Sequence, residues 1–319
     1  MRVVLASHET SCGQGGETRL LLMSHGNHIG SYIVISPVKD EERHLETTIH
    51  AVLNQTLRPA LWVIVDDGSR DATPEILRRY TTAHDWIRVL RIERDAARRP
   101  GSGVMRAFTV GYRSIGRTEF DFVVKLDCDL DFPRDYFEQL LARFQQDERL
   151  GIASGLCMEK NKKGWYPSSG PPYHAVGASK MVRKKCFEAI GGFAPSRGWD
   201  TIDEIRAQMM GWRTCHVREL KFYHLKPEGS GIGFVRTNAM HGEIYHLTGG
   251  GTFFFLLKIA HRTLFGKPFP LAGLAMLYGF LRARVSGRKR LVSTAEAEFY
   301  RRVLNERIWR GLRTAWGVN

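Results

Sequence analysis

The stretch VVKLDCDLDFP, residues 123–133, places three carboxylates at alternate positions directly after an apolar run. Asp127, Asp129 and Asp131 would repel one another at the end of a buried strand unless a positive charge lay among them. The same stretch suits a turn, because Asp is common in turns and the proline can open a helix. Taken alone, it leaves a turn and a cation site as equal alternatives.

The surrounding chain alternates short apolar runs with helical patterns. The runs predict buried strands, and they occupy residues 32–38, 61–69, 87–94 and 120–127. Alternating strands and helices predict the fold class, an α/β domain with a Rossmann-like, mostly parallel sheet flanked by helices.

Three polar clusters follow strands of this predicted sheet, and they are PVKDEE (37–42), DDGSRD (66–71) and DCDLD (127–131). Ligands of such sheets bind beyond the carboxyl ends of the strands. The fold would therefore bring the three clusters together, although the sequence separates them. That convergence favours a cation or nucleotide site over a turn.

The following part of the chain predicts fewer regular elements. Residues 151–160 suit a further strand, and the loop 161–174, rich in Gly, Pro and Ser, suits a mobile lid or an acceptor loop. A short helix is expected within residues 181–193. The segment 198–214 is acidic at its start and helical after it, and a strand with a loop follows.

The composition is that of a globular chain, since 319 residues are enough for one large or two ordinary domains and 43% are hydrophobic. The net charge of +14 predicts anionic partners, but residues 258–319 contain 13 Lys or Arg and only 3 Asp or Glu. The basic character therefore belongs to the C-terminal part. The five cysteines form no CxxC pair, which points to free thiols in a reducing compartment.

Three regions are expected along the chain. Residues 1–30, rich in Gly, Ser, Thr and His, predict a poorly ordered leader, and Met23 is our hypothesis for the true start. Residues 31–250 form the predicted catalytic domain. Residues 251–319 predict basic amphipathic helices, whose apolar runs are shorter than the roughly 18 residues that a spanning helix needs.

These C-terminal helices combine apolar faces, aromatic side chains and flanking Arg residues, which suits an anionic membrane interface. The alternative is that the apolar faces pack on the catalytic domain. The first interpretation predicts a cytoplasmic protein that is peripheral on the inner face of the cell membrane.

Four segments, in this order, resemble the glycosyltransferase family 2 pattern on a GT-A fold: SPVKDEERHLETTI, VIVDDGSRDATPEIL, VVKLDCDLDFP and GGFAPSRGWDTIDEIRAQMMGWRT. The resemblance covers residues 32–228. It implies an inverting, metal-dependent hexosyltransferase that takes a sugar from a nucleotide-diphosphate sugar, most simply of the UDP type. The acceptor would be a hydroxyl of a glycan or lipid-linked acceptor in cell-surface polysaccharide or glycolipid synthesis. A Gln-x-x-Arg-Trp motif, typical of processive synthases in the family, is absent, which favours transfer of a single sugar.

The departing diphosphate needs its developing negative charge neutralised, and a divalent cation can do this. Asp127 and Asp129, two apart in an extended chain, point to the same side and can hold Mn²⁺ or Mg²⁺, which prefer oxygen ligands. His224, in YHLKP, is a candidate for a further metal ligand or a phosphate contact, although a lone His is more often structural.

The nucleotide sugar is expected to lie against the first two clusters. Asp66 and Asp67 end the second strand, where one of them can accept a hydrogen bond from a uracil-like ring, and turn capping is the alternative for Asp67. The remaining donor-site candidates are Pro37, Lys39, Asp40 and Glu42 in the same pocket, Arg94 and Arg106 as phosphate contacts, and Asp127.

The acceptor hydroxyl must lose a proton as it attacks the anomeric carbon, and a carboxylate can take that proton. The resemblance places this acid at Asp200, where many members have Glu-Asp and this chain has Trp199-Asp200. Asp203 and Glu204 are close enough to compete. The structural alternative for Asp200 is a favourable position at a helix start.

A basic nucleic-acid-binding protein without transferase activity is the alternative that the net charge raises. No RNP, zinc or helix-turn-helix signature occurs, so no nucleic-acid partner is expected. A dinucleotide-binding oxidoreductase is also disfavoured, because SPVKDEE stands where GxGxxG would follow the first strand.

Overall fold

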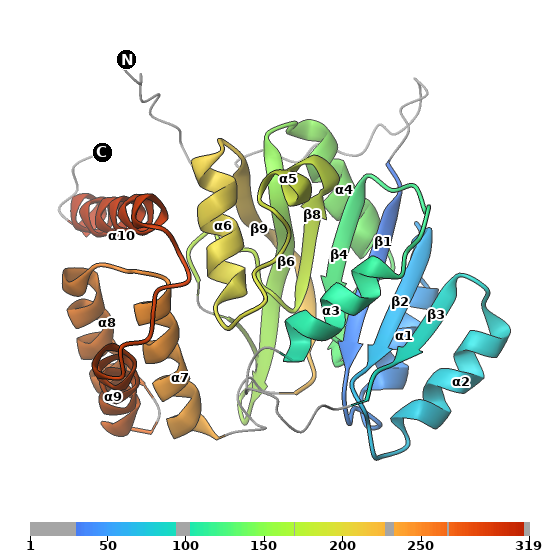
Figure 1. Cartoon of the computed structure of the whole chain (residues 1–319), viewed down its shortest axis with the longest axis horizontal. Coiled ribbons are helices and arrows are strands. Elements are labelled where there is room, and N and C mark those ends of the chain that lie inside the picture. Colours follow the sequence, from blue (N-terminus) through green and yellow to red (C-terminus); the bar gives the residue numbers. More distant parts are fainter. Residues whose placement is uncertain (1–29, 94–102, 169, 227–232, 267, 316–319) are drawn as a thin grey trace. The chain divides into compact units, whose positions relative to one another are not determined.

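The computed structural model describes residues 30–93, 103–168, 170–226, 233–266 and 268–315. They form two compact units, one within residues 30–191 and 211–225 and the other within 192–210 and 226–315 (Figure 1). Residues 1–29 of the expected leader lie outside the described residues. The units reflect spatial proximity alone, so a functional boundary at residue 250 stays a prediction.

The first unit is built on one mixed sheet with the strand order β3-β2-β1-β4-β8-β6-β9-β5, and β7 pairs with β6. Strands β3, β2, β1 and β4 run parallel, and so do β6 and β9. Strands β8, β7 and β5 are antiparallel to their partners. The strands are β1 Tyr32–Val38, β2 Leu61–Asp66, β3 Ile87–Arg91, β4 Phe122–Leu126, β5 Leu130–Asp131, β6 Leu150–Asn161, β7 Gly164–Pro167, β8 Ser179–Arg183 and β9 Arg213–His224.

Helices cover both faces of the sheet, because its central parallel strands are apolar on both sides. All six residues of β2, LWVIVD, are buried. Helix α3 lies on one face, and α1 and α4 lie on the other (Figure 1). The helices of this unit are α1 Leu45–Leu53, α2 Thr73–Ala83, α3 Gly103–Arg113, α4 Tyr136–Gln146 and α5 Lys184–Ala189.

The side-chain alternation of the strands separates the two layers. Val34 and Ile64 belong to the core cluster that includes the apolar residues of α1 and α4. Their neighbours Ile35 and Val65 face α3, where a Cβ on Gly111 would lie 2.7 Å from Ile35 Cγ2 and 2.9 Å from Val65 Cγ2. Glycine at this position therefore lets α3 pack directly on the sheet, and this packing fixes the ends of β1 and β2.

The prediction for the loop 161–174 was wrong in part. Strand β6 runs on to Asn161, and β7 folds back on it as a hairpin. The Tyr166 hydroxyl donates a hydrogen bond to Glu159 Oε2 (2.9 Å), and the Trp165 ring lies edge-on to Tyr223. The hairpin itself is local, and the Gly- and Pro-rich composition of the segment hides it, whereas the contact of Trp165 with Tyr223 joins residues that are distant in sequence.

Strand β8 was also missed, because its residues SKMVR run directly into the expected short helix. Every residue of β8 pairs with β4, and Ser179 lies opposite Leu126 at the end of that strand. The short helix itself is confirmed as α5. Strand β8 therefore supports the end of β4, where the acidic cluster 127–131 begins.

The second unit is helical, which confirms the predicted C-terminal helical region. Its core is formed by Tyr245, Phe255, Met276 and Leu304. Helices α7 and α9 pack with almost no gap, since a Cβ on Gly242 or Gly279 would collide with the facing backbone. The helices are α6 Trp199–Met209, α7 Phe234–Leu247, α8 Thr252–Phe265, α9 Leu271–Val285 and α10 Thr294–Ala315. Of the helices that the structure describes, none has both the length and the apolarity to span a bilayer.

Candidate functional site

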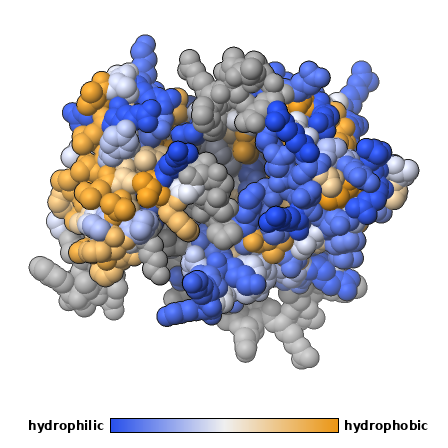
Figure 2. Space-filling view, turned by 90° about the horizontal axis from the view of Figure 1, so that it is seen from below, coloured by the Kyte–Doolittle hydropathy of each residue, from blue (hydrophilic) through white to orange (hydrophobic). Residues whose placement is uncertain are grey.

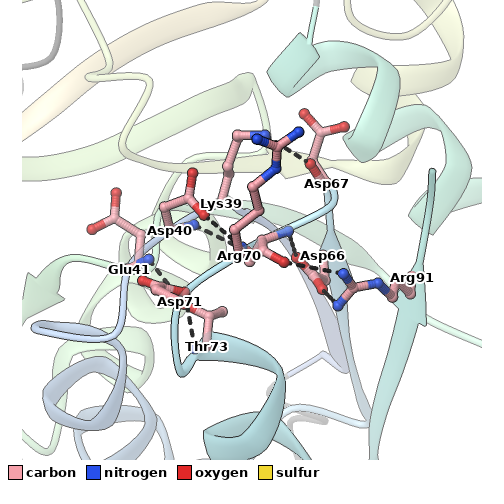
Figure 3. Close-up of polar contacts among 10 residues, drawn as sticks. Lys39, Asp40, Glu41, Asp66, Asp67, Arg70, Asp71, Thr73 and Arg91 are labelled. Atoms are coloured by element: carbon pink, nitrogen blue, oxygen red, sulfur yellow. Dashed lines mark hydrogen bonds and ion pairs between the residues drawn. The ribbon is translucent and has the colours of Figure 1, made fainter. Parts of the chain in front are cut away.

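The turns after β1 and β2 hold each other through reciprocal hydrogen bonds (Figure 3). The Asp40 backbone N–H donates to Ser69 Oγ (3.0 Å), and the Arg70 N–H donates to Asp40 Oδ1 (2.8 Å). Asp71 Oδ2 accepts from the Glu42 N–H (3.0 Å). The first two predicted clusters therefore form one rigid double turn at the carboxyl ends of neighbouring parallel strands.

The backbone of this double turn contains one strained position. Asp40 has φ +52°, the left-handed region, and it is the non-glycine residue with positive φ among those described. Asp tolerates this conformation better than most residues, because its short side chain can bond to nearby backbone groups. The hydrogen bonds of Asp40 to the second turn over-determine its geometry, which is typical of a preorganised binding loop.

Asp66 is used to build the second turn. Its Oδ1 accepts a hydrogen bond from the Ser69 N–H (2.8 Å), and its Oδ2 is ion-paired with Arg91 Nη1 (2.8 Å). Arg91 Nη2 also donates to the Ser69 carbonyl (3.0 Å). Both oxygens of Asp66 thus shape the loop, and its predicted contact with a base stays a prediction.

Asp67 lies between two cations contributed by different elements. Lys39 Nζ donates to its backbone carbonyl (3.2 Å), and Arg106 Nη2 of α3 lies 3.7 Å from its Oδ1. The Asp67 N–H donates to the Val38 carbonyl (2.9 Å), which ties it to the end of β1. The structure therefore brings Lys39, Asp67 and Arg106 together, as the sequence predicted for a donor pocket, while Arg94 lies outside the described residues.

The third cluster begins at the end of β4, the strand next to β1. Asp127 pairs through Oδ1 with Lys125 Nζ at 2.5 Å, and Lys125 is only 3% exposed. Asp129 Oδ2 lies 3.3 Å from His224 Nε2 on β9. Asp131 points to solvent. Two of the three acids are therefore buried or half-buried beside cations, and the third is separate from them.

Burial is the main reason why the pKa of Asp127 is raised, and the nearby Asp129 charge adds to it, while Lys125 opposes it. Burial alone would lower the pKa of His224, but its hydrogen bonds to Asp129 and Cys157 and the charges of Asp129 and Asp127 raise it to about 10. At neutral pH His224 is therefore a cation that donates to Asp129. A protonated imidazole has no lone pair for a metal, so its charge suits a phosphate contact, and both predicted roles stay predictions.

Burial and backbone hydrogen bonds also hold the third cluster in place. Cys128 between the two acids is buried, and burial together with the charges of Asp127 and Asp129 raises its thiol pKa. Thr48 of α1 donates to the Leu130 carbonyl (2.7 Å) and accepts from the Leu130 N–H (2.8 Å). The acidic segment is thus attached to α1, which follows the first polar turn.

Asp127 and Asp129 are the candidate ligands for a divalent cation. Within the described ranges, no group of three or more His, Cys, Asp or Glu side chains is arranged to hold a metal ion. Mg²⁺ and similar ions are, however, commonly held by one or two carboxylates together with substrate phosphates and water. Asp127 and Asp129 repel each other, and a cation beside them would relieve that repulsion. The pair fits a divalent ion that arrives with a phosphorylated ligand.

The three candidate bases lie on α6, in the second unit. Asp200 is partly exposed in the first turn, and its Oδ1 accepts from the Thr201 N–H (3.0 Å). Asp203 and Glu204 are buried, and Asp203 Oδ1 accepts from the Glu204 N–H (2.8 Å). The predicted catalytic role of these acids stays a prediction.

Sequence reasoning missed two cations of the site, Lys125 and Arg91. Lys125 interrupts an apolar strand two positions before Asp127, so strand alternation puts both on one face. That spacing was a readable signal of a buried ion pair. Arg91 lies opposite Asp66 in the β2–β3 register, and this relation becomes visible only once the two strands are paired.

Comparison with known proteins identifies the family of this chain. The family model described as glycosyl transferase family 2 matches residues 33–198, which is more than half of the chain. One curated relative is the teichuronic acid biosynthesis glycosyltransferase TuaG of Bacillus subtilis. It is 31% identical over 108 residues, which cover 34% of this chain and 39% of the length of TuaG. The chain spans from 29% to 53% of the length of the curated relatives it matches.

Two solved structures share the fold, which confirms the predicted GT-A-like architecture. The mannosyltransferase PcManGT of Pyrobaculum calidifontis, in complex with GDP-Man and Mn²⁺, has a TM-score of 0.52 at 17% identity and covers 91% of this chain and 84% of its own. Residues 1–349 of TarS from S. aureus, in complex with UDP-GlcNAc, have a TM-score of 0.50 at 16% identity and cover 85% of this chain and 78% of theirs. At these identities the likeness shows the fold alone.

Proposed function

Because the chain belongs to glycosyl transferase family 2, and is therefore a glycosyltransferase, we propose that it transfers one hexose from a UDP-type sugar, with inversion, to a hydroxyl of a glycan or lipid-linked acceptor. The product would belong to a cell-surface polysaccharide or glycolipid. The observation that carries the proposal is the pair Asp127 and Asp129, held beside cations at the end of β4 and next to the double turn after β1 and β2.

The donor would bind along the carboxyl ends of β1, β2 and β4. Lys39, Asp67 and Arg106 form a group of mixed charge that suits a nucleotide, since carboxylates accept from base N–H groups and cations face phosphate. The double turn is already locked, so little conformational entropy remains to be lost on binding. The complexes of PcManGT with GDP-Man and of TarS with UDP-GlcNAc support a nucleotide-sugar donor.

Asp127 and Asp129 would hold a divalent cation, Mn²⁺ or Mg²⁺, together with the diphosphate. Such an ion, when bound, neutralises the charge that develops on the leaving diphosphate. His224, protonated at neutral pH, would add positive charge at the same edge of the sheet. Lys125 keeps Asp127 in place through their ion pair, so the carboxylate does not need to reorganise when the donor arrives.

The chemical step would be a direct displacement at the anomeric carbon. A bond forms between the acceptor oxygen and that carbon, and the bond from the carbon to the diphosphate oxygen breaks. The acceptor proton passes to a carboxylate, for which Asp200 is our choice, and the nucleoside diphosphate leaves with the electron pair. Asp200 suits this role better than Asp203 or Glu204, because it is partly exposed whereas they are buried.

Two measurements test the proposal. A screen of nucleotide sugars for hydrolysis and thermal stabilisation, with and without Mn²⁺, should select a UDP-sugar and show a gain with Mn²⁺. The Asp200→Asn variant should keep donor binding and lose transfer by ~10²- to 10⁴-fold, the usual contribution of a general base. If no nucleotide sugar is bound or hydrolysed, the proposal is wrong. If Asp200→Asn turns over near the wild-type rate, Asp203 or Glu204 holds the role of base.

A further inference from the structure

Large apolar side chains of the second unit are exposed along the hairpin formed by α8 and α9, which we call the apolar hairpin (residues 252–285). Figure 2 shows hydrophobic residues gathered in a patch over these helices. Tyr278 is 60% exposed and Val285 is 85% exposed. The other exposed apolar residues of the hairpin are Phe253, Leu256, Leu257, Leu264, Phe265, Phe269, Leu271, Leu274 and Leu281. A patch of this length on one hairpin indicates a contact surface.

Helix α9 is apolar on both of its faces. Small residues at helical spacing, among them Ala272, Gly279 and Ala283, are on the buried face, and Gly279 packs against the backbone of α7. The outward face carries Leu274, Tyr278 and Leu281. A helix on a water-exposed surface normally has polar residues there. No charged residue occurs from 271 to 281, so this exposed face lacks the polar residues of an ordinary surface helix.

The charged residues of the segment that contains the hairpin all have one sign. Residues 244–295 contain eight Lys or Arg and no Asp or Glu. Arg282, Arg284, Lys289 and Arg290 are exposed directly after the apolar part of α9. Cations that flank an apolar helix face can reach lipid phosphates while their aliphatic stems stay on the apolar surface.

We propose that the apolar hairpin lies in the interface of an anionic lipid membrane, with its outward face among the acyl chains and the basic residues at the headgroups. Exposed Phe and Tyr side chains suit this depth. The helices that the structure describes are too short or too polar to cross the bilayer, which fits an interfacial position. A second copy of the chain is a poorer occupant, because a contact between two such segments would place like charges together. Membrane binding in this way does not depend on the transfer chemistry.

The test is flotation of the full chain with vesicles of phosphatidylcholine alone and of phosphatidylcholine with 30% phosphatidylglycerol. We expect the protein to float with the anionic vesicles, and to bind them at least ~10-fold more tightly than the neutral ones. High salt should reduce this preference, because it screens the charges. If the full chain fails to float with anionic vesicles, the proposal is overturned.

Two variants separate the apolar and the charged contributions. L274Q/Y278Q/L281Q should reduce binding to both kinds of vesicle by ~10-fold or more, since each buried apolar group contributes to partitioning. R282Q/R284Q/K289Q should lose the preference for anionic vesicles, because each basic side chain that is removed should lower the affinity for these vesicles about fivefold. The substituted residues are exposed, so both variants should keep the wild-type melting temperature.

Matched controls place the same substitutions elsewhere. V104Q/M209Q/M210Q removes exposed apolar side chains outside the hairpin, and R113Q/R117Q/K185Q removes exposed cations of the first unit. Both controls should float like the wild type. The proposal is overturned if these controls lose binding as the hairpin variants do. It is also overturned if light scattering shows a dimer that L274Q/Y278Q/L281Q converts to a monomer without any change in flotation.

Discussion

Aspartates that follow β2 and β4, at the carboxyl edge of one sheet, have their charges balanced in different ways. After β2, Asp66 and Asp71 accept backbone N–H groups, and an exposed Arg91 completes the set for Asp66. After β4, Asp127 and Asp129 face the side chains Lys125 and His224. Backbone hydrogen bonds fix the shape of a loop, whereas side-chain cations hold the carboxylates by charge and leave their remaining oxygen atoms for a ligand. The turn after β2 is therefore a rigid frame, and the turn after β4 is a charged site positioned to receive a ligand.

The largest expected effect comes from the turn after β4. Asp127→Asn should lower the transfer rate by ~10³-fold or more, because the departing diphosphate loses its charge compensation. The matched control is Asp131→Asn, which changes an exposed acid four residues away in the same motif and should leave the rate near wild type. Initial rates with a UDP-sugar measure both. Equal losses in the two variants would show that the motif acts as a whole and that the distinction between its acids is wrong.

Lys125→Met tests whether the buried cation supports the same carboxylate. It should lower the free energy of unfolding by about 2–3 kcal/mol, less than the roughly 3–5 kcal/mol of a fully buried pair, because Asp127 is 29% exposed. Urea unfolding measures this. In the double variant Lys125→Met/Asp127→Asn most of the loss should be recovered, since no unpaired charge remains. A loss in the double variant as large as in the single one would contradict the pairing.

The smallest effect belongs to the rigid frame. Burial alone would raise the pKa of Asp71, but hydrogen bonds from the Thr73 side chain and from the backbone of Glu42 and Thr73 lower it. A carboxylate whose pKa is lower in the folded than in the unfolded state stabilises the fold when the pH is above the ordinary pKa of 3.8. This stability is lost as the pH falls through the lower pKa of the folded state.

Asp71→Asn should therefore weaken the dependence of unfolding free energy on pH between about pH 5 and pH 2, measured by urea unfolding at several pH values. Glu75→Gln, which changes an exposed carboxylate at the start of α2, is the control and should keep more of the wild-type slope. An unchanged slope in Asp71→Asn would mean that the hydrogen bonds at this turn do not favour the ionised carboxylate.

Local signals in the sequence were enough for the parallel half of the fold. The apolar runs at 32–38 and 61–69 each contain a buried strand of the sheet, and the acidic clusters stand where these strands end. That placement follows from side-chain burial and from the rule that parallel strands share their carboxyl edge. The convergence of the first two clusters was predictable for the same reason.

Elements stabilised by distant partners were not predictable. Strand β8 depends on β4, which lies more than 50 residues earlier in the chain, and it has no clear alternating pattern of its own. At the site, the ion pair of Arg91 with Asp66 requires the register of two strands. Lys125 is the exception, because its position two residues before Asp127 could have been interpreted as a shared face. Apolar faces on the C-terminal helices were predicted, but hydrophobicity alone does not tell which side of α9 is covered and which is exposed.

The central claim is that Asp127 and Asp129 bind a divalent cation together with a nucleoside diphosphate. Calorimetric titration of UDP into the full chain, with MnCl₂ and then with EDTA, tests it most directly, and the Asp127→Asn variant is measured in parallel. We predict that Mn²⁺ tightens UDP binding at least ~10-fold in the wild type, as expected for a charge shared between carboxylates and phosphates, and leaves the variant unaffected. Equal affinity for UDP in wild type with and without Mn²⁺ would contradict the claim.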